Sequence, residues 1–441
     1  MNILLGTLRT ISVTLLDPQL ALILAILAVL LYRQNKKTTV MQKMIIGESL
    51  NSAMELTLSQ IVIGIFAGVF GSIMLSFLGV AFDADSSIFL IFLVSIFFMF
   101  WKPRYTCFSY SGAILGFVSL FLELISRVYA GVKVNILGSV INLSDVNVLK
   151  IDIGALITMI AVLHFVEGIL VIIDGKKGVL PVFTNRDNKI IGGFAFRRSW
   201  VLPIALFFIV GNASSLGYTE NIATPNWWPL LKNSSLLHMA KDAAVSMLAY
   251  YGVVGYSSIT FTRKKEEKVF YSGAAIILYS ILIFMLAQFA SFGYMYKLAI
   301  IIITPLAHEL MLNLQRYLEV KGNPKYVSSE EGIMVLEVAP NSPAFEMGIK
   351  SGDLIVEVND KRNIDEQDIL QAGKQGINYV SFKLKTALGN LKEVSYNRLN
   401  RETKLGIVFV PRNIPKDEAV VPYDNDNFRD VLDKIKDEHK D

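Results

Sequence analysis

The chain has 441 residues, of which 53% are hydrophobic and 18% are charged, and its mean hydropathy is +0.48. This composition excludes an ordinary soluble protein, and the length excludes a single small domain. The net charge of +4 is too small to indicate nucleic-acid binding. We therefore predict a polytopic membrane protein that is embedded in the lipid bilayer and binds no nucleic acid.

Apolar stretches follow one another through most of the chain. Several are shorter than the roughly 20 residues that a membrane span needs, so we expect about seven to nine spans within a transmembrane helical domain over 1–325. No small-residue cleavage site follows the first stretch, which predicts a retained anchor. The candidate spans are 17–32, 56–81, 87–101, 106–126, 153–173, 200–211, 241–260, 271–293 and 297–313.

Basic residues alternate along the loops between these stretches. By the positive-inside rule, the loops after the first, third, fifth and seventh stretches are cytoplasmic. This places the N-terminus outside and the C-terminal segment inside, and the N-terminus moves inside if the first stretch is re-entrant. The residues that carry the assignment are Arg33, Lys36, Lys37 and Lys43, then Lys102 and Arg104, then Lys176, Lys177, Arg186, Lys189, Arg197 and Arg198, then Arg263, Lys264, Lys265 and Lys268.

Small residues form one face of the second stretch. Gly64 and Gly68 have the GxxxG spacing, and Gly71 continues the same face. Such a face lets another backbone approach closely. Packing within the chain is the simpler interpretation, and the alternative is a contact between two copies in a homo-oligomer.

Four ionisable residues stand inside predicted spans, where an unpaired charge is costly. His164 and Glu167 are three apart on one helix face, and His308 and Glu309 lie in the last stretch. We predict an intramembrane polar cluster of these four residues that forms hydrogen bonds between helices. The alternative is a metal or proton site, although we predict no metal, no cofactor and no catalytic residue.

A His-Glu pair before the C-terminal segment also suggests a divergent site-2-type intramembrane metalloprotease. That chemistry needs HExxH, in which two imidazoles one turn apart hold zinc. Leu312 stands at the position of the second histidine, and no later span supplies a further aspartate ligand. The single cysteine, Cys107, excludes an internal disulfide and is interpreted as a small core residue. A transporter or channel is a third hypothesis, weakened by the lack of a clear inverted repeat.

The segment 331–360 has a different pattern from everything before it. An apolar run enters a Pro-Asn-Ser-Pro corner, becomes a short helix ending at Gly348, turns at 351–353 and resumes as a strand. This resembles the core of a PDZ domain. We predict a small α+β, PDZ-like domain over 326–412, followed by a charged tail over 413–441.

A PDZ groove binds an extended peptide as an added strand. We predict that Leu405, Gly406 and Ile407 form its carboxylate-binding loop and first strand residue, and that Ile369 and Leu370 line it from the helix of 365–373. The rival loop is 326–331, and the remaining alternative is that the groove binds nothing.

The order of features resembles the MinJ family of polytopic division-site proteins. The resemblance rests on YRQNKK after the first stretch, LHFVEGIL in the fifth, GYSSITFTRKKEEKVFYSGAAIILYSILI, and PLAHEL then YLEVKGNPKY before a terminal PDZ-like domain. It implies a non-enzymatic adaptor at poles and septa. Its implied partners are a MinD-like ATPase of the Min system and a DivIVA-like curvature sensor, and the family is usually drawn with both ends in the cytoplasm.

The predicted fold is therefore a polytopic α-helical membrane bundle followed by a small cytoplasmic α+β domain. The predicted function is an integral membrane scaffold of the bacterial division site, and the alternative is the divergent metalloprotease.

Overall fold

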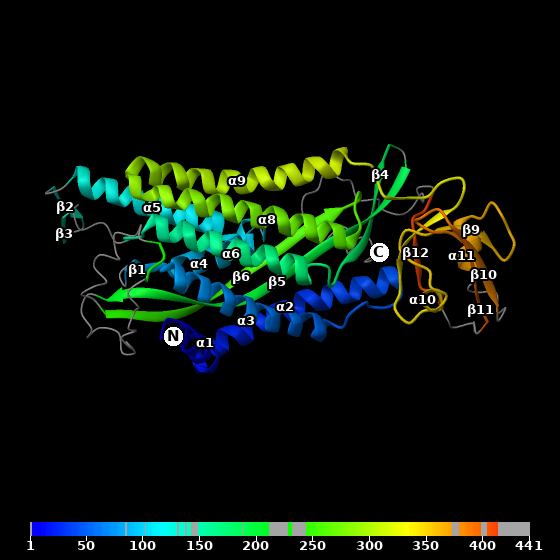
Figure 1. The fold of residues 1–441 in the computed structure, drawn as a ribbon, viewed down its shortest axis with the longest axis horizontal. Coiled ribbons are helices and arrows are strands. Elements are labelled where there is room, and N and C mark those ends of the chain that lie inside the picture. Colours follow the sequence, from blue (N-terminus) through cyan, green and yellow to red (C-terminus); the bar gives the residue numbers. More distant parts are fainter. Residues whose placement is uncertain are drawn as a thin grey trace.

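The structure is a computed structural model in which a long helical bundle carries a small α+β domain at one end (Figure 1). The bundle is the predicted polytopic α-helical assembly, and the C-terminal domain has the predicted mixed topology. The predicted charged tail, 413–441, lies outside the described residues. The residues described are 2–83, 86–101, 103–129, 132–136, 139–142, 149–187, 189–210, 228–231, 244–372, 379–397 and 404–412.

Among the described residues, six helices are long and apolar enough to cross a membrane. Their ends follow ordinary capping chemistry: the Asp17 carboxylate accepts the N–H of Gln19, and Gly47 ends the same helix at a φ of 91°. A shorter helix, α1 (Asn2–Leu16), precedes them and was not predicted. The six are α2 (Pro18–Ile46), α3 (Ala53–Leu78), α5 (Phe108–Val128), α6 (Ile153–Asp174), α8 (Lys265–Ala287) with the 3₁₀ turn η3 (Gln288–Phe292), and α9 (Tyr294–Lys321).

The sixth and seventh predicted spans are wrong, because their described residues, 200–210 and 244–260, are β-strands. Strand β5 (Lys189–Val210) pairs antiparallel with β6 (Ala244–Thr260) from Phe194↔Thr260 to Val210↔Ala244. At about 3.3 Å per residue, the 22 residues of β5 run roughly 70 Å along the bundle (Figure 1). The hairpin also pairs with β4 (Leu180–Arg186) and, in parallel, with β1 (Ala81–Asp83).

The glycine face of α3 packs against this hairpin. A Cβ on Gly64 would lie 2.3 Å from the Val201 carbonyl oxygen, and one on Gly68 would lie 2.5 Å from the Pro203 carbonyl oxygen. These contacts are within the chain, as in the simpler interpretation of the GxxxG spacing. Their partner is a strand rather than a second helix.

The third stretch is only half a span. Helix α4 (Leu90–Trp101) ends at the 3₁₀ turn η1 (Pro103–Thr106), and α5 starts directly after Cys107. The Cys107 sulfur touches His164, halfway along α6, so this turn lies within the bundle. The prediction of a cytoplasmic loop after the third stretch is therefore wrong at η1, while Lys102 lies outside the described residues.

The C-terminal domain has one sheet in the order β11-β10-β9-β8-β12. Its short helix begins after Ser342, whose hydroxyl accepts the Phe345 N–H, and Gly348 and Gly352 take positive φ values where the chain turns. This confirms the predicted strand, helix, turn and strand. The elements are β8 (Ile333–Val338), α10 (Pro343–Glu346), β9 (Leu354–Val358), α11 (Glu366–Ala372), β10 (Val380–Lys385), β11 (Leu391–Tyr396) and β12 (Ile407–Phe409).

The C-terminal domain is joined to the bundle by packing as well as by the chain. Strand β7 (Tyr326–Val327) pairs with β5 at Gly192 and Ile191, and Lys265 forms an ion pair with Glu337 at 2.6 Å. Leu336, Val408 and Val410 belong to the same buried apolar cluster as Phe194. The two parts therefore share one apolar core at their junction.

Candidate functional sites

Strand β12 forms one wall of the candidate peptide groove. It is the last strand of its sheet, and it has no strand partner on its outer side among the described residues. Such an edge is where an extended peptide adds as a further strand. Just before it, Gly406 has a φ of 74°, and the N–H groups of Leu405 and Gly406 donate to no other described residue. This is the backbone arrangement that a carboxylate-binding loop requires.

Helix α11 is the predicted other wall of the groove. The Arg412 N–H donates to the Glu366 carboxylate at 2.7 Å, which holds the segment after β12 beside the first turn of α11. Leu370 is 51% exposed on this helix, whereas Ile369 is buried in the domain core. Of the two predicted helix residues, only Leu370 has an exposed side chain.

The rival loop, 326–331, serves a different purpose. Its first residues form β7 against the bundle, and the Tyr326 ring lies edge-on to the Phe194 ring at 5.4 Å. Because Tyr326 is buried there, this loop is already used in the junction. The geometry favours Leu405, Gly406 and Ile407 as the ligand-binding loop.

The intramembrane polar residues gather around a sulfur atom. Nε2 of His164 lies 2.9 Å from the Cys107 Sγ, and Nε2 of His308 lies 3.6 Å from the same Sγ. The two imidazole rings are 5.7 Å apart between centroids. The structure therefore brings together the two predicted histidines from α6 and α9, and adds Cys107 from the start of α5.

The two predicted carboxylates stand beside this centre. The Glu167 carboxylate lies 4.0 Å from Nε2 of His164. The Glu309 carboxylate accepts the Tyr110 hydroxyl proton at 2.5 Å, and the same hydroxyl lies 3.0 Å from Nδ1 of His308. All four predicted residues thus belong to one neighbourhood, in which the histidines face the centre and Glu309 lies behind His308.

Four members of this neighbourhood were not predicted as site residues: Cys107, Ser109, Tyr110 and Tyr279. Cys107 was interpreted as a small core residue, but its thiol faces two imidazoles. Tyr279 lies in α8 and donates to the Thr304 carbonyl at 3.0 Å, while its oxygen also contacts Ser109 at 2.8 Å. The sequence does place tyrosines inside apolar runs. Because a buried tyrosine hydroxyl needs a hydrogen-bond partner, these tyrosines could have indicated the polar neighbourhood.

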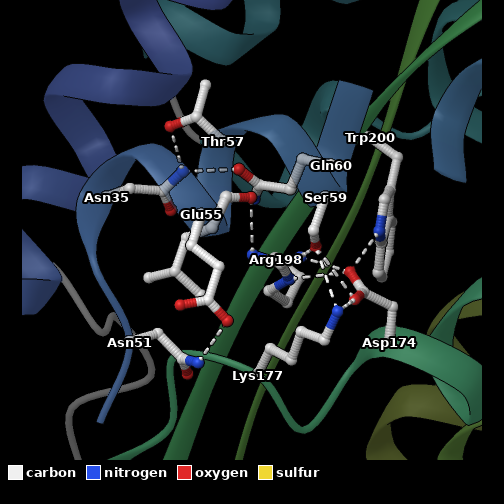
Figure 2. A network of polar contacts seen from close by, with 11 residues as sticks. Asn35, Asn51, Glu55, Thr57, Ser59, Gln60, Asp174, Lys177, Arg198 and Trp200 are labelled. Atoms are coloured by element: carbon white, nitrogen blue, oxygen red, sulfur yellow. Dashed lines mark hydrogen bonds and ion pairs between the residues drawn. The ribbon is translucent and has the colours of Figure 1, made fainter. Parts of the chain in front are cut away.

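A second buried network fixes the strand hairpin near the C-terminal domain (Figure 2). Arg198 of β5 donates to Asp174 at the end of α6, and both side chains are fully buried. The Trp200 indole donates to the same carboxylate at 2.9 Å, and Lys177 lies 3.1 Å from it. Because Arg198 also donates to Ser59 of α3 at 2.7 Å, one ion pair joins two helices and the hairpin.

Comparison with known proteins assigns the C-terminal domain. A PDZ domain model matches residues 334–378. The chain carries a PDZ domain. In this region it is 46% identical over 44 residues to serine endoprotease DegS of Haemophilus influenzae, covering 10% of this chain and 13% of DegS. It is 44% identical over 51 residues to human serine protease HTRA3, covering 12% of this chain and 11% of HTRA3. These likenesses to proteases concern the PDZ domain alone.

A longer match includes the bundle. The chain is 24% identical over 234 residues to the cell division topological determinant MinJ of Bacillus subtilis, covering 52% of this chain and 54% of MinJ. It thus spans about half the length of MinJ, and the likeness predicted from the sequence is found over that half. No solved structure matches the chain.

Proposed function

We propose that the chain is an integral membrane scaffold of the bacterial division site whose PDZ domain recruits protein partners. The observation that carries this proposal is the extent of the likeness to MinJ. An alignment of 234 residues is longer than the whole segment after Lys325, so it includes part of the bundle. The likeness to the division protein therefore involves the bundle, and the chain carries a PDZ domain after it.

The distribution of basic residues supports a cytoplasmic PDZ domain. Lys43 lies in the last turn of α2, Lys177 follows α6, and Lys264 and Lys265 begin α8, all at the bundle end that carries the PDZ domain. Basic residues beside spans favour the cytoplasmic side. Helices α1 and α2 follow one another along the bundle, so the N-terminus lies at the opposite end (Figure 1). In this topology the N-terminus is outside, unlike the usual drawing of the family.

Partner binding follows from the free edge of β12. A peptide that pairs with this edge would place its carboxylate at the N–H groups of Leu405 and Gly406, and a side chain against Leu370. By resemblance, the partners are a MinD-like ATPase of the Min system and a DivIVA-like protein, and the assembly places them at septa and poles.

Two exposed leucines of the PDZ domain provide the test. Leu370→Glu puts a charge into the groove, whereas Leu388→Glu changes a side chain that is 88% exposed in the turn between β10 and β11. In a rod-shaped Gram-positive cell, we expect Leu370→Glu to disperse the labelled MinD-like partner from septa and Leu388→Glu to leave it in place. Both variants should reach the membrane in equal amounts.

The outcomes separate the groove from the scaffold. If the partner keeps its septal position with Leu370→Glu but loses it when the chain is deleted, binding does not use the groove. If deletion also leaves the partner in place, the scaffold proposal is wrong. Glu309→Gln tests the metalloprotease alternative in the same cells, because a scaffold keeps its function without that carboxylate.

A further inference from the structure

Three potential metal ligands from distant parts of the chain meet inside the bundle. Cys107 precedes α5, His164 lies at the middle of α6, and His308 lies within α9. One ligand atom from each lies within 4.8 Å of the others, and both histidines are buried. This centre is independent of the PDZ groove, which is at the end of the molecule.

Hydrogen bonds behind each ring direct an imidazole lone pair toward the sulfur. Nδ1 of His164 lies 2.8 Å from the Ile160 carbonyl oxygen, which can only accept, so Nδ1 carries the proton. The Tyr110 hydroxyl gives its proton to Glu309, so its oxygen accepts from Nδ1 of His308 at 3.0 Å. In both neutral rings, Nε2 therefore bears the lone pair. A histidine that binds a metal through one ring nitrogen usually donates a hydrogen bond from its other ring nitrogen, as both histidines do here.

Around the sulfur, the hydrogen-bond acceptors of the described residues outnumber the protons that face them. Three oxygen and nitrogen atoms can only accept: Nε2 of both histidines and the Tyr279 oxygen, whose own proton goes to Thr304. The donors that face them are the Cys107 thiol and the Ser109 hydroxyl, with one proton each. Among the described residues, these two protons are fewer than the three acceptors, and a cation at the centre would satisfy both imidazole lone pairs and the sulfur together.

The distances suit zinc. Zinc–sulfur and zinc–nitrogen bonds of about 2.3 and 2.0–2.1 Å at a tetrahedral angle place sulfur and nitrogen about 3.5 Å apart. The sulfur lies 3.6 Å from Nε2 of His308, which already fits, and 2.9 Å from Nε2 of His164, a separation that must widen. The ligand atoms of the two histidines lie within 4.8 Å of each other. A thiolate with two imidazoles is a ligand set that selects zinc over magnesium or calcium.

We propose that Cys107, His164 and His308 bind a zinc ion, with Tyr110 as a positioning residue for His308. Three protein ligands leave a fourth position for water. The ion would tie the turn between α4 and α5 to α6 and α9, halfway along the bundle.

The single cysteine makes the site visible in the full chain. The protein, purified in detergent and treated with chelator, is titrated with Co²⁺ and then with Zn²⁺. We expect one Co²⁺ per chain, a thiolate-to-cobalt charge-transfer band and its displacement by Zn²⁺. Because the chain has one cysteine, such a band reports Cys107 alone.

Matched variants assign the remaining ligands. Cys107→Ser should abolish the charge-transfer band, and His164→Gln or His308→Gln should each weaken Co²⁺ binding more than Tyr110→Phe does. For Tyr110→Phe we expect about 10- to 100-fold weaker binding, the usual cost of losing a group that orients a metal ligand. His439→Gln removes an imidazole from the C-terminal tail and should change nothing.

A measurement on the native protein tests the proposal even if the variants fail to fold. Zn²⁺ should slow the reaction of the Cys107 thiol with a maleimide in the native protein. A native protein that gives no thiolate band with Co²⁺ and no protection by Zn²⁺ overturns the proposal. A charge-transfer band that survives in Cys107→Ser, or equal affinities in the His164→Gln and His439→Gln variants, overturns it as well.

Discussion

The bundle and the PDZ domain use ion pairs in different settings. In the bundle, the side chains of Asp174 and Arg198 are both 0% exposed, and the pair connects two helices to the strand hairpin (Figure 2). In the PDZ domain, Lys361 is 60% exposed and Asp368 17% exposed, and their pair joins residues seven apart in the sequence. Water can replace either partner of the second pair but neither partner of the first. We therefore expect that removing one partner destabilises the packing of helices and strands only for the bundle pair.

The largest expected effect comes from breaking the buried pair. Asp174→Ala leaves the Arg198 guanidinium without its carboxylate inside the bundle, and also removes the acceptor of the Trp200 indole. We expect a loss of about 3–5 kcal/mol in the free energy of unfolding, the usual cost of an uncompensated buried charge. Unfolding of the purified chain by sodium dodecyl sulfate, followed by tryptophan fluorescence, measures it.

A double variant separates the charge from the packing. Asp174→Leu with Arg198→Met removes both charges at once, and replacing a buried pair by apolar residues is often nearly neutral. We expect the double variant to unfold closer to the native protein than Asp174→Ala does. If it is as unstable as the single variant, the contacts of Asp174 with Lys177, Ser59 and Trp200 matter more than the pair itself.

The junction between the two regions should be less sensitive. A Cβ on Gly192 would lie 2.7 Å from a Val410 methyl carbon and 3.0 Å from one of Leu336, so Gly192→Val forces the PDZ domain away from β5. We expect a cost of about 1–3 kcal/mol, typical of overpacking, and faster proteolysis in 322–332. Lys189→Val, at an exposed position of the same strand, is the control. Equal proteolysis in both variants would show that the domain is not held by this contact.

The two regions also differ in how much of their fold could be predicted. The PDZ elements depend on local chemistry, such as the Ser342 cap and the turn glycines Gly348 and Gly352, which a sequence displays directly. Residues Trp200 to Ile209 of β5 form a continuous apolar run, and all of them are buried. Without alternation between faces, a buried strand of this kind looks like a short membrane helix.

The intramembrane centre shows the same limit. His164 and His308 were predicted because ionisable residues are rare in membrane spans. Leu370 and Gly406 were predicted in the same way from a known pattern, that of the PDZ domain. Cys107 was missed because a lone cysteine in an apolar run is usually a small core residue. Only the turn of η1 inside the bundle brings its sulfur between two imidazoles, and nothing in the local sequence of 103–107 indicates where that turn lies in space.

The smallest expected effect concerns the exposed pair, and it depends on pH. The hydrogen bond from Lys361, together with that from the Asp365 N–H, lowers the pKa of the Asp368 carboxyl below its usual range. A lowered pKa in the folded state stabilises the domain at neutral pH, and this contribution is lost as the pH falls through the folded-state value. Asp368→Asn should therefore lower the thermal unfolding temperature slightly at neutral pH. This difference from the native chain should shrink as the pH falls below about 4, the ordinary aspartate pKa, and vanish below the lowered pKa of the folded state. The control is Asp360→Asn, which removes another exposed carboxylate. Asp360 has a positive φ, a backbone conformation that asparagine also adopts. If Asp368→Asn destabilises the chain as much as Asp174→Ala at neutral pH, exposure does not separate the two kinds of ion pair.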